Sequence, residues 1–95
     1  MKLRKETELL KQIRSILFWD WDPIGVNDVP EASDEYDSYA GGVLRLLVAN
    51  ASEYQLIKHL HQIETVSMGL SSGIDAEYRK TAVRKLLQLK NEQLR

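Results

Sequence analysis

The residues of this chain whose types and spacing come nearest to a metal site lie between Asp20 and Glu31. Aligned with the twelve-residue calcium loop of an EF-hand, acids occupy positions 1, 3, 9 and 12, and Gly25 occupies position 6. Position 5, which normally supplies a ligand, is Ile24, and two prolines stiffen the loop. Because the ligand set is broken where coordination needs it, we expect no calcium and interpret the segment as an acidic loop with Asx turns.

Other groupings of reactive side chains give weaker signals. His59 and His61 have the spacing of metal ligands on a strand, but on a helix such residues diverge, so we interpret them as solvent-facing. Cysteine is absent, which removes thiol catalysis and disulfides. No glycine-rich phosphate loop or serine elbow is present, and a chain of 95 residues offers little room to desolvate a carboxylate. We therefore expect no enzymatic activity, no metal and no cofactor.

The acidic and aromatic residues of this chain are concentrated between positions 19 and 39. Both tryptophans, two of the four tyrosines and seven of the fourteen acids lie there, and no Lys or Arg occurs between Arg14 and Arg45. Aromatic side chains supply contact area and carboxylates complement a basic partner, so we predict a protein-binding surface. The acids supply charge, and the aromatic residues supply either anchors or the scaffold of the loop. The predicted partner-binding residues are Asp20, Asp22, Asp28, Asp34, Glu35, Asp37, Trp19, Trp21, Tyr36 and Tyr39.

Two alternative readings remain open. Trp19 and Trp21 can instead cap the end of a helical bundle, while the acids keep the loop in solution. Residues 79–95 carry six bases and one acid, so the face of the last helix is a candidate nucleic-acid surface. Interleaved aromatic residues are missing there and the acidic loop repels phosphate, which disfavours nucleic acid. The basic face comprises Arg79, Lys80, Arg84, Lys85 and Lys90.

The periodicity of apolar residues predicts helices throughout and no strands. The first helix covers residues 4–18, and Asp22-Pro23 prevents any continuation, because a residue before proline is pushed out of the helical region. The second begins near Ser33 or Asp34, with Tyr36 and Tyr39 on its apolar stripe. Residues 1–95 are thus predicted to form one domain, an all-α bundle of four helices. Between the first two helices lies an ordered acidic loop, residues 19–33, held by one of the tryptophans.

The third and fourth helices carry their own start and stop signals. Ser52-Glu53-Tyr54-Gln55 matches a capping box, and Gly69 fits the residue that follows a helix end. The predicted apolar stripe of the third helix continues through Leu60 and Ile63 to Val66 or Ser67. That of the fourth consists of Tyr78, Ala82, Val83, Leu86 and Leu87.

Two stretches of the acidic segment also resemble a known signature. Trp21-Asp22-Pro23-Ile24-Gly25, followed by Asp34-Glu35-Tyr36-Asp37 and Tyr39, looks like the W-D-P-[IL]-G … D-E-Y-D signature of a group of small bacterial all-helical proteins, mostly uncharacterised. The resemblance covers roughly residues 10–70 and implies a helical fold without a settled activity. In character, the small size and the acid-rich motif are similar to immunity proteins encoded beside bacterial toxins, including those of contact-dependent inhibition systems.

These observations lead to one functional expectation. We expect a cytoplasmic, non-enzymatic protein-binding domain, most concretely an immunity protein that neutralises a toxin with a basic surface. A nuclease fits, because its active site is basic to hold phosphate. The alternatives are a housekeeping or regulatory bundle whose signature is structural, and a nucleic-acid binder. The charged N-terminus predicts no signal peptide, and no apolar run reaches the roughly 18 residues of a membrane span.

Overall fold

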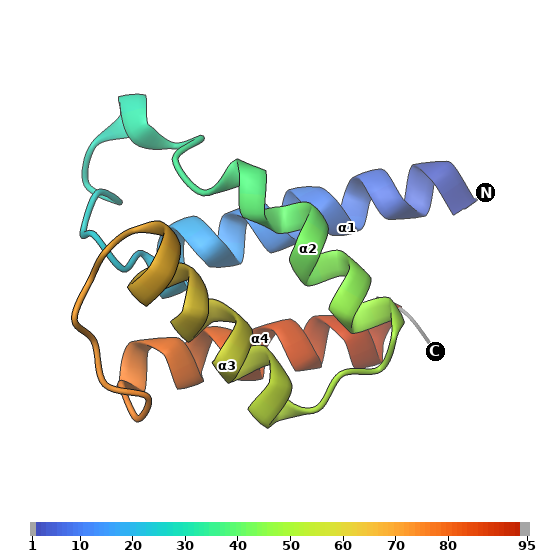
Figure 1. Cartoon of the computed structure of the whole chain (residues 1–95). Helices are drawn as coiled ribbons and strands as arrows, with labels where there is room; N and C mark the ends of the chain where they lie inside the picture. The colour runs from blue at the N-terminus through green and yellow to red at the C-terminus, as the bar shows by residue number, and fades with distance from the viewer. Residues whose placement is uncertain (1, 94–95) are drawn as a thin grey trace.

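The computed structural model describes residues 2–93, and the side chains of residues 7–93, as a bundle of helices (Figure 1). Its four α-helices are α1 (Lys2–Ile16), α2 (Asp37–Val48), α3 (Glu53–Gln62) and α4 (Glu77–Gln93). The first and third continue into the π-helical turns η1 (Leu17–Trp21) and η3 (Ile63–Ser67), and a short 3₁₀ turn, η2 (Pro30–Ala32), lies between α1 and α2. The part of the chain described contains no strand, and the predicted all-α four-helix fold is confirmed.

The core is built from the apolar stripe of each helix. Along α1, buried residues recur every four positions and point inward. There α1 contacts α2, η1 and α4, and α3 packs against α4 on the other side. Each fully buried Leu, Ile or Val contributes about 1.5–3 kcal/mol relative to an exposed position. The central residues, all at most 1% exposed, are Leu9, Ile13, Leu17, Val43, Leu47, Leu56, Leu60, Val83 and Leu86.

The two π-turns change which side chains face inward. Their bonds span five residues, from the Asp22 N–H to the Leu17 carbonyl and from the Met68 N–H to the Ile63 carbonyl, both at 2.9 Å. The extra residue in each turn rotates the following side chains relative to an α-helix. Glu64, four residues after Leu60, stays on the buried stripe, whereas Val66 and Ser67 face solvent. The prediction that Val66 or Ser67 faces the core is therefore wrong: Val66 is 72% exposed.

The boundaries around the acidic segment also differ from the prediction. The helical path continues to Trp21 instead of ending at 18, because η1 absorbs the residues before the proline. Asp22 then ends it in the left-handed conformation, with φ 33°. The second helix begins at Asp37 and not near Ser33, since Pro30–Ala32 and the turn at Glu35 close their own short bonds first. Tyr36 occupies the N-cap position.

The signals at the ends of α3 are confirmed. Ser52 and Gln55 form the capping box, with each side chain accepting from the backbone N–H of the other. Gly69 has φ 69°, and the next residue, Leu70, donates its N–H to the Glu64 carbonyl at 2.8 Å. Among the residues described, no helix combines the length and apolarity needed to cross a bilayer.

Candidate functional site

The acidic loop, as the structure defines it, comprises residues 22–36 and is organised around the Asp22 carboxylate. This carboxylate accepts hydrogen bonds from the backbone N–H groups of Val26 (2.8 Å) and Asn27 (3.1 Å). It also accepts one from the Tyr36 hydroxyl, at 2.7 Å. Asp22 therefore joins the beginning of the loop to its end. Its side chain holds this segment in the ordered conformation that was predicted for it.

The aromatic residues of the signature form the base on which the loop sits. Trp21 and Tyr36 are each 1% exposed, their ring centroids lie 5.3 Å apart, and the Tyr39 ring meets Trp21 edge-on at 6.1 Å. The Tyr36 hydroxyl also accepts from the Ile24 N–H at 3.3 Å. Burial, together with the bond to Asp22, raises the pKa of Tyr36 above its usual value. Trp21 and Tyr36 are thus scaffold and not contact surface.

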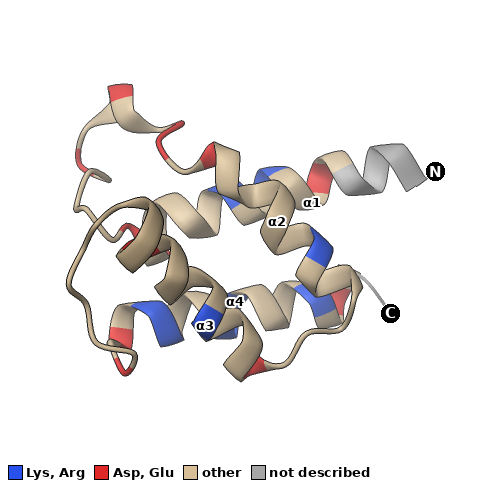
Figure 2. Ribbon diagram, in the orientation of Figure 1, with Lys and Arg blue, Asp and Glu red and all other residues tan. Residues whose placement is uncertain are grey.

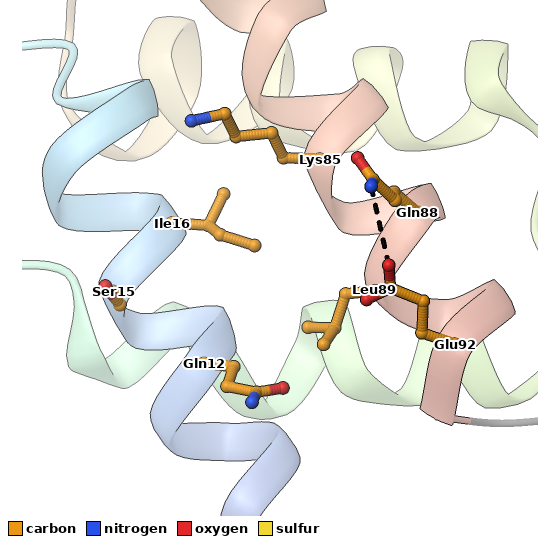
Figure 3. Close-up of a pocket in the computed structure, with 7 residues that line it drawn as sticks. All are labelled: Gln12, Ser15, Ile16, Lys85, Gln88, Leu89 and Glu92. Carbon is orange, nitrogen blue, oxygen red and sulfur yellow. Dashed lines mark hydrogen bonds between the residues drawn. The ribbon is translucent and has the colours of Figure 1, made fainter.

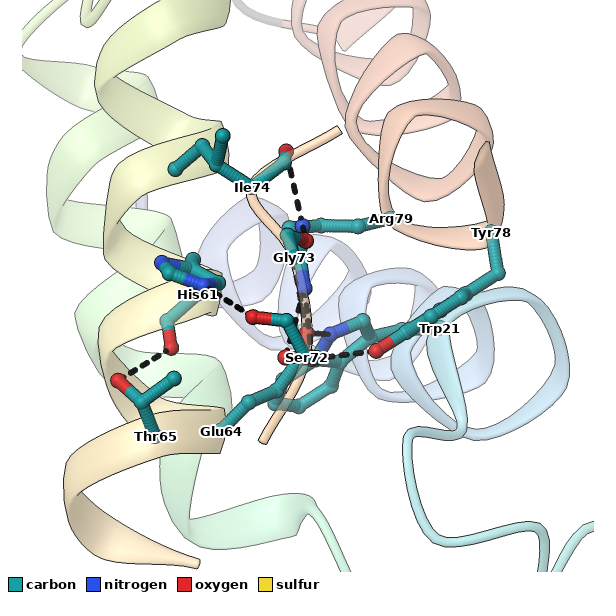
Figure 4. A network of polar contacts seen from close by, with 9 residues as sticks. All are labelled: Trp21, His61, Glu64, Thr65, Ser72, Gly73, Ile74, Tyr78 and Arg79. Atoms are coloured by element: carbon teal, nitrogen blue, oxygen red, sulfur yellow. Dashed lines mark hydrogen bonds and ion pairs between the residues drawn. The ribbon is translucent and has the colours of Figure 1, made fainter. Parts of the chain in front are cut away.

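Beneath this base lies a fully buried ion pair, Glu64 with Arg79 (Figure 4). The guanidinium donates from Nε at 2.8 Å and from Nη2 at 2.7 Å to the two carboxylate oxygens. The same oxygens accept from Trp21 Nε1 at 2.8 Å, from Ser72 Oγ at 2.7 Å and from the Tyr78 hydroxyl. A buried carboxylate is tolerated only when it is paired and hydrogen-bonded in this way.

The remaining donors of Arg79 hold the linker between η3 and α4. Its Nη1 donates to the carbonyls of Gly73 (2.9 Å) and Ile74 (3.0 Å), and the ring N–H of His61 donates to the Ser72 carbonyl at 2.8 Å. Burial raises the pKa of Glu64, but the bonds from Arg79, Tyr78, Ser72 and Trp21 outweigh it and lower that pKa to about 2. The pair therefore ties η1, η3, the linker and α4 together.

Neither member of this pair was predicted to be buried, and placing Arg79 on the basic face of the last helix is wrong. Arg79 sits three, four and seven residues before Ala82, Val83 and Leu86, so it occupies the apolar stripe of α4. Glu64 follows Leu60 by four residues, so it continues the apolar stripe of α3, the helix that packs against α4. Opposite charges on two facing apolar stripes were the signal available in the sequence.

The carboxylates that face solvent are a subset of those predicted. Asp28, Glu31, Asp34 and Glu35 are exposed, and within residues 7–93 none forms an ion pair. They lie on the projecting segment at one end of the molecule (Figure 2). Trp19 is 60% exposed, and its backbone carbonyl accepts from the Asn27 side chain at 3.3 Å, which places it next to the loop.

The other predicted contact residues have internal partners. Asp20 pairs with Lys85 of α4 at 2.8 Å, and Asp37 lies 3.9 Å from Arg14 of α1. Tyr39 is half-buried against Trp21. Together with Trp21, Asp22 and Tyr36, they belong to the support of the loop, and the exposed acids and Trp19 remain as its outer surface.

The basic face of α4 is partly neutralised. Besides the buried Arg79 and the Lys85–Asp20 pair, Arg84 lies 3.5 Å from Glu77, and Lys80 lies 4.0 Å from Asp75. Lys90 donates to the Asn50 side chain. These contacts reduce the free positive charge available to a polyanion.

Two surface cavities are open to a ligand, and neither contains the buried pair of Glu64 and Arg79. The first, about 360 Å³, lies between α1 and α4 and is lined by Ile16, Lys85 and Leu89 among others (Figure 3). The second, about 370 Å³, lies between α2 and α3. Within residues 7–93, whose side chains the structure describes, no three residues of metal-ligating type come together.

The two histidines are half-buried, so the prediction that they face solvent is wrong. His61 is held by the Ser72 carbonyl. Burial, and then the nearby Arg45 cation, lower the pKa of His59 below its usual value.

Comparisons of the chain with protein-family models, with curated proteins and with solved structures give no match.

Proposed function

We propose that this chain is a non-enzymatic protein-binding domain whose acidic loop, together with Trp19, binds a basic surface of a partner protein. In its most specific form, the proposal is an immunity protein that acts in the cytoplasm and neutralises a bacterial toxin, a nuclease being the toxin whose site fits best. The observation that carries the proposal is that the side chains of residues 19–39 fall into a buried group and an exposed group. Buried side chains fix the loop, and its exposed carboxylates, within the part of the chain described, have no cation of their own.

The physical support is preorganisation. A loop that is already held by Asp22 and the buried Tyr36 loses little conformational entropy when it binds. Its exposed carboxylates attract a basic surface from a distance and accelerate association. Trp19, 60% exposed and next to the loop, is the type of side chain that dominates the binding energy of protein interfaces.

The interpretation of the signature as structural is compatible with this proposal. Trp21, Asp22 and Tyr36, which the resemblance places in the signature, make internal contacts. Binding depends instead on exposed acids of the loop, such as Asp28 and Glu35. The nucleic-acid alternative loses support, because Arg79 is buried and Lys85 is paired with an acid.

Enzymatic chemistry has no equivalent support. Glu64 and Tyr78, whose pKa values are shifted, are hydrogen-bonded to each other, and Glu64 also accepts from Arg79. A catalytic acid or base must instead reach a substrate within hydrogen-bond distance.

The test uses the purified product of the gene directly beside the one that encodes this chain. Binding is measured by biolayer interferometry for the wild type and for Asp28→Lys/Asp34→Lys/Glu35→Lys. We expect the loop variant to bind at least about tenfold more weakly, a loss of about 1.4 kcal/mol. No binding of the neighbouring product refutes the immunity proposal.

A matched control separates the loop from net charge. Glu8→Lys/Asp75→Lys/Glu92→Lys reverses three exposed acids elsewhere and changes the net charge equally. Equal losses in the two triple variants contradict the assignment of the surface, because they show that only total charge matters.

A further inference from the structure

The second cavity is a groove between α2 and α3 with an apolar floor and a cationic edge. Leu46, Ala49 and Ala51 supply the floor, and Lys58 and His59 stand at the edge; because the pKa of His59 is lowered, Lys58 is the cation among the lining residues. The Tyr54 ring, 63% exposed, borders the groove, with Lys58 Nζ 5.6 Å from its centroid. We name this site, lined also by Gln55 and Gln62, the α2–α3 groove.

A second cation, Arg45, lies beside the groove. A Cβ at Gly42 would lie 3.5 Å from His59 Nε2 and 3.7 Å from Arg45 Nη2, so the Arg45 guanidinium and the His59 ring, which lines the groove, meet over the same point of α2. Within residues 7–93, neither Arg45 nor Lys58 forms an ion pair with an acid. The groove thus presents positive charge above an apolar floor.

One segment of this protein has the complementary chemistry, the acidic loop. Its carboxylates at Glu31, Asp34 and Glu35 are exposed without a counterion in the region described, and Val29, 40% exposed, offers an apolar side chain beside them. The loop and the linker that joins α2 to α3 lie at opposite ends of the molecule (Figure 1). A loop can therefore reach a groove only on another copy.

We propose that the α2–α3 groove of one copy receives the acidic loop of a second copy, so that the chain associates with itself head to tail. The carboxylates of the loop meet Arg45 and Lys58, and Val29 covers the apolar floor. In such a pair one copy keeps its groove free and the other keeps its loop free, so the contact is heterologous and continues into short chains or a ring. This inference requires no foreign partner and goes beyond the proposed function; a basic partner bound to the loop would compete with it.

Two properties set the expected strength. The net charge of −1 is close to zero, which leaves little overall repulsion between copies. A single loop over a cavity of about 370 Å³ makes a contact at the small end of protein interfaces. We therefore expect reversible association that depends on concentration and is weakened by salt.

The test is sedimentation velocity of the wild-type chain over a concentration series up to about 1 mM, at about 0.02 M and about 0.5 M salt. At low salt the average mass should rise above the 10.9 kDa of one chain as concentration increases, and at high salt it should return to that value. A wild type that stays at 10.9 kDa at every concentration overturns the proposal.

Charge exchange identifies the surfaces. Arg45→Glu/Lys58→Glu makes both loop and groove acidic, and Glu31→Lys/Glu35→Lys removes the net charge of the four exposed loop acids, because Asp28 and Asp34 remain, so each variant alone should associate at least about tenfold more weakly than the wild type. All four positions are exposed, and circular dichroism verifies that the variants remain folded. An equimolar mixture should recover association between the acidic loop of Arg45→Glu/Lys58→Glu and the unchanged groove of Glu31→Lys/Glu35→Lys.

Two control variants carry the same charge changes away from both surfaces. These are Lys11→Glu/Arg84→Glu and Glu8→Lys/Glu92→Lys, all at exposed positions of α1 and α4. Each control alone should associate more than its matched variant. Controls that behave like the groove and loop variants, or a mixture that fails to recover association, overturn the assignment of these surfaces.

Discussion

The substitution Glu64→Gln removes the charge of the buried pair while keeping its shape. The carboxylate of Glu64 accepts bonds from Arg79, Tyr78, Ser72 and Trp21, all of which are donors. An amide replaces one of its acceptor oxygens with an NH₂ group, which then faces donors. The Arg79 guanidinium, fully buried, is left without a counterion.

The magnitude follows from two independent considerations. The pKa of Glu64 falls from 4.5 to about 2, which corresponds to roughly 3 kcal/mol of stability at neutral pH. Removing one partner of a buried ion pair typically costs about 3–5 kcal/mol. A domain of 95 residues has a total stability of about 5–14 kcal/mol, so the variant should lose a large fraction of it.

The assay is urea denaturation of the wild type and Glu64→Gln at several pH values. Because the pKa of the folded state lies below the unfolded one, this contribution is fully present above about pH 5 and is lost as the pH falls from 4.5 toward 2. The variant should lack that part of the acid sensitivity. A loss below about 1 kcal/mol at pH 7, with an unchanged pH profile, would refute the reasoning.

A double-mutant cycle supplies the control for the same prediction. Replacing both partners, as Glu64→Leu/Arg79→Met, leaves no uncompensated charge, so the double variant should be destabilised less than the sum of the single variants. We expect a coupling free energy of at least about 2 kcal/mol. Additive single losses would show that the two charges do not depend on each other.

Three further predictions concern the acidic segment. Trp21→Ala should cost about 3–5 kcal/mol and Trp19→Ala less than about 1 kcal/mol in thermal unfolding, because only the first is buried; equal losses contradict the structure. Tyr36→Phe should cost about 1–3 kcal/mol and speed amide hydrogen exchange in the loop, because Asp22 loses a buried donor; unchanged exchange contradicts the role of that bond. Millimolar calcium should not raise the melting temperature, because the Asp22 oxygens already accept three hydrogen bonds; a saturable rise would reverse this expectation.

The fold was predictable to the extent that it follows helical periodicity. The capping box at Ser52 and the turn at Gly69 marked the beginning of α3 and the end of its continuation η3 correctly, because these signals act within a few residues. The π-turns were not predictable in this way. The extra residue in η3 turned Val66, which was expected to face the core, toward solvent.

The site was predictable in composition but not in geometry. Trp19 and Trp21 are two residues apart, so only one of them can face the core, and the choice depended on the turn η1. Asp22 and Glu35 are both acids of the signature, yet one organises the loop and the other faces solvent. Only the distance between side chains far apart in the sequence, such as Asp22 and Tyr36, separates support from surface.

The same separation explains how a small bundle can present a defined binding surface. The buried pair of Glu64 and Arg79 holds Trp21, and Trp21 packs against Tyr36, whose hydroxyl bonds to Asp22. A chain of contacts thus runs from the core to the loop. We infer that substitutions in this chain of contacts change binding indirectly, through loss of loop order, and lower stability at the same time.

The most direct test of the central claim is the association rate with the neighbouring gene product, measured by stopped flow at about 0.05 M and about 0.5 M salt. The wild type should associate quickly at low salt and much more slowly at high salt. The loop variant Asp28→Lys/Asp34→Lys/Glu35→Lys should be slow at both and nearly independent of salt, while its stability stays close to that of the wild type. If Lys80→Glu/Arg84→Glu/Lys85→Glu abolishes the fast phase and the loop variant retains it, the binding surface lies on α4 and the account is contradicted.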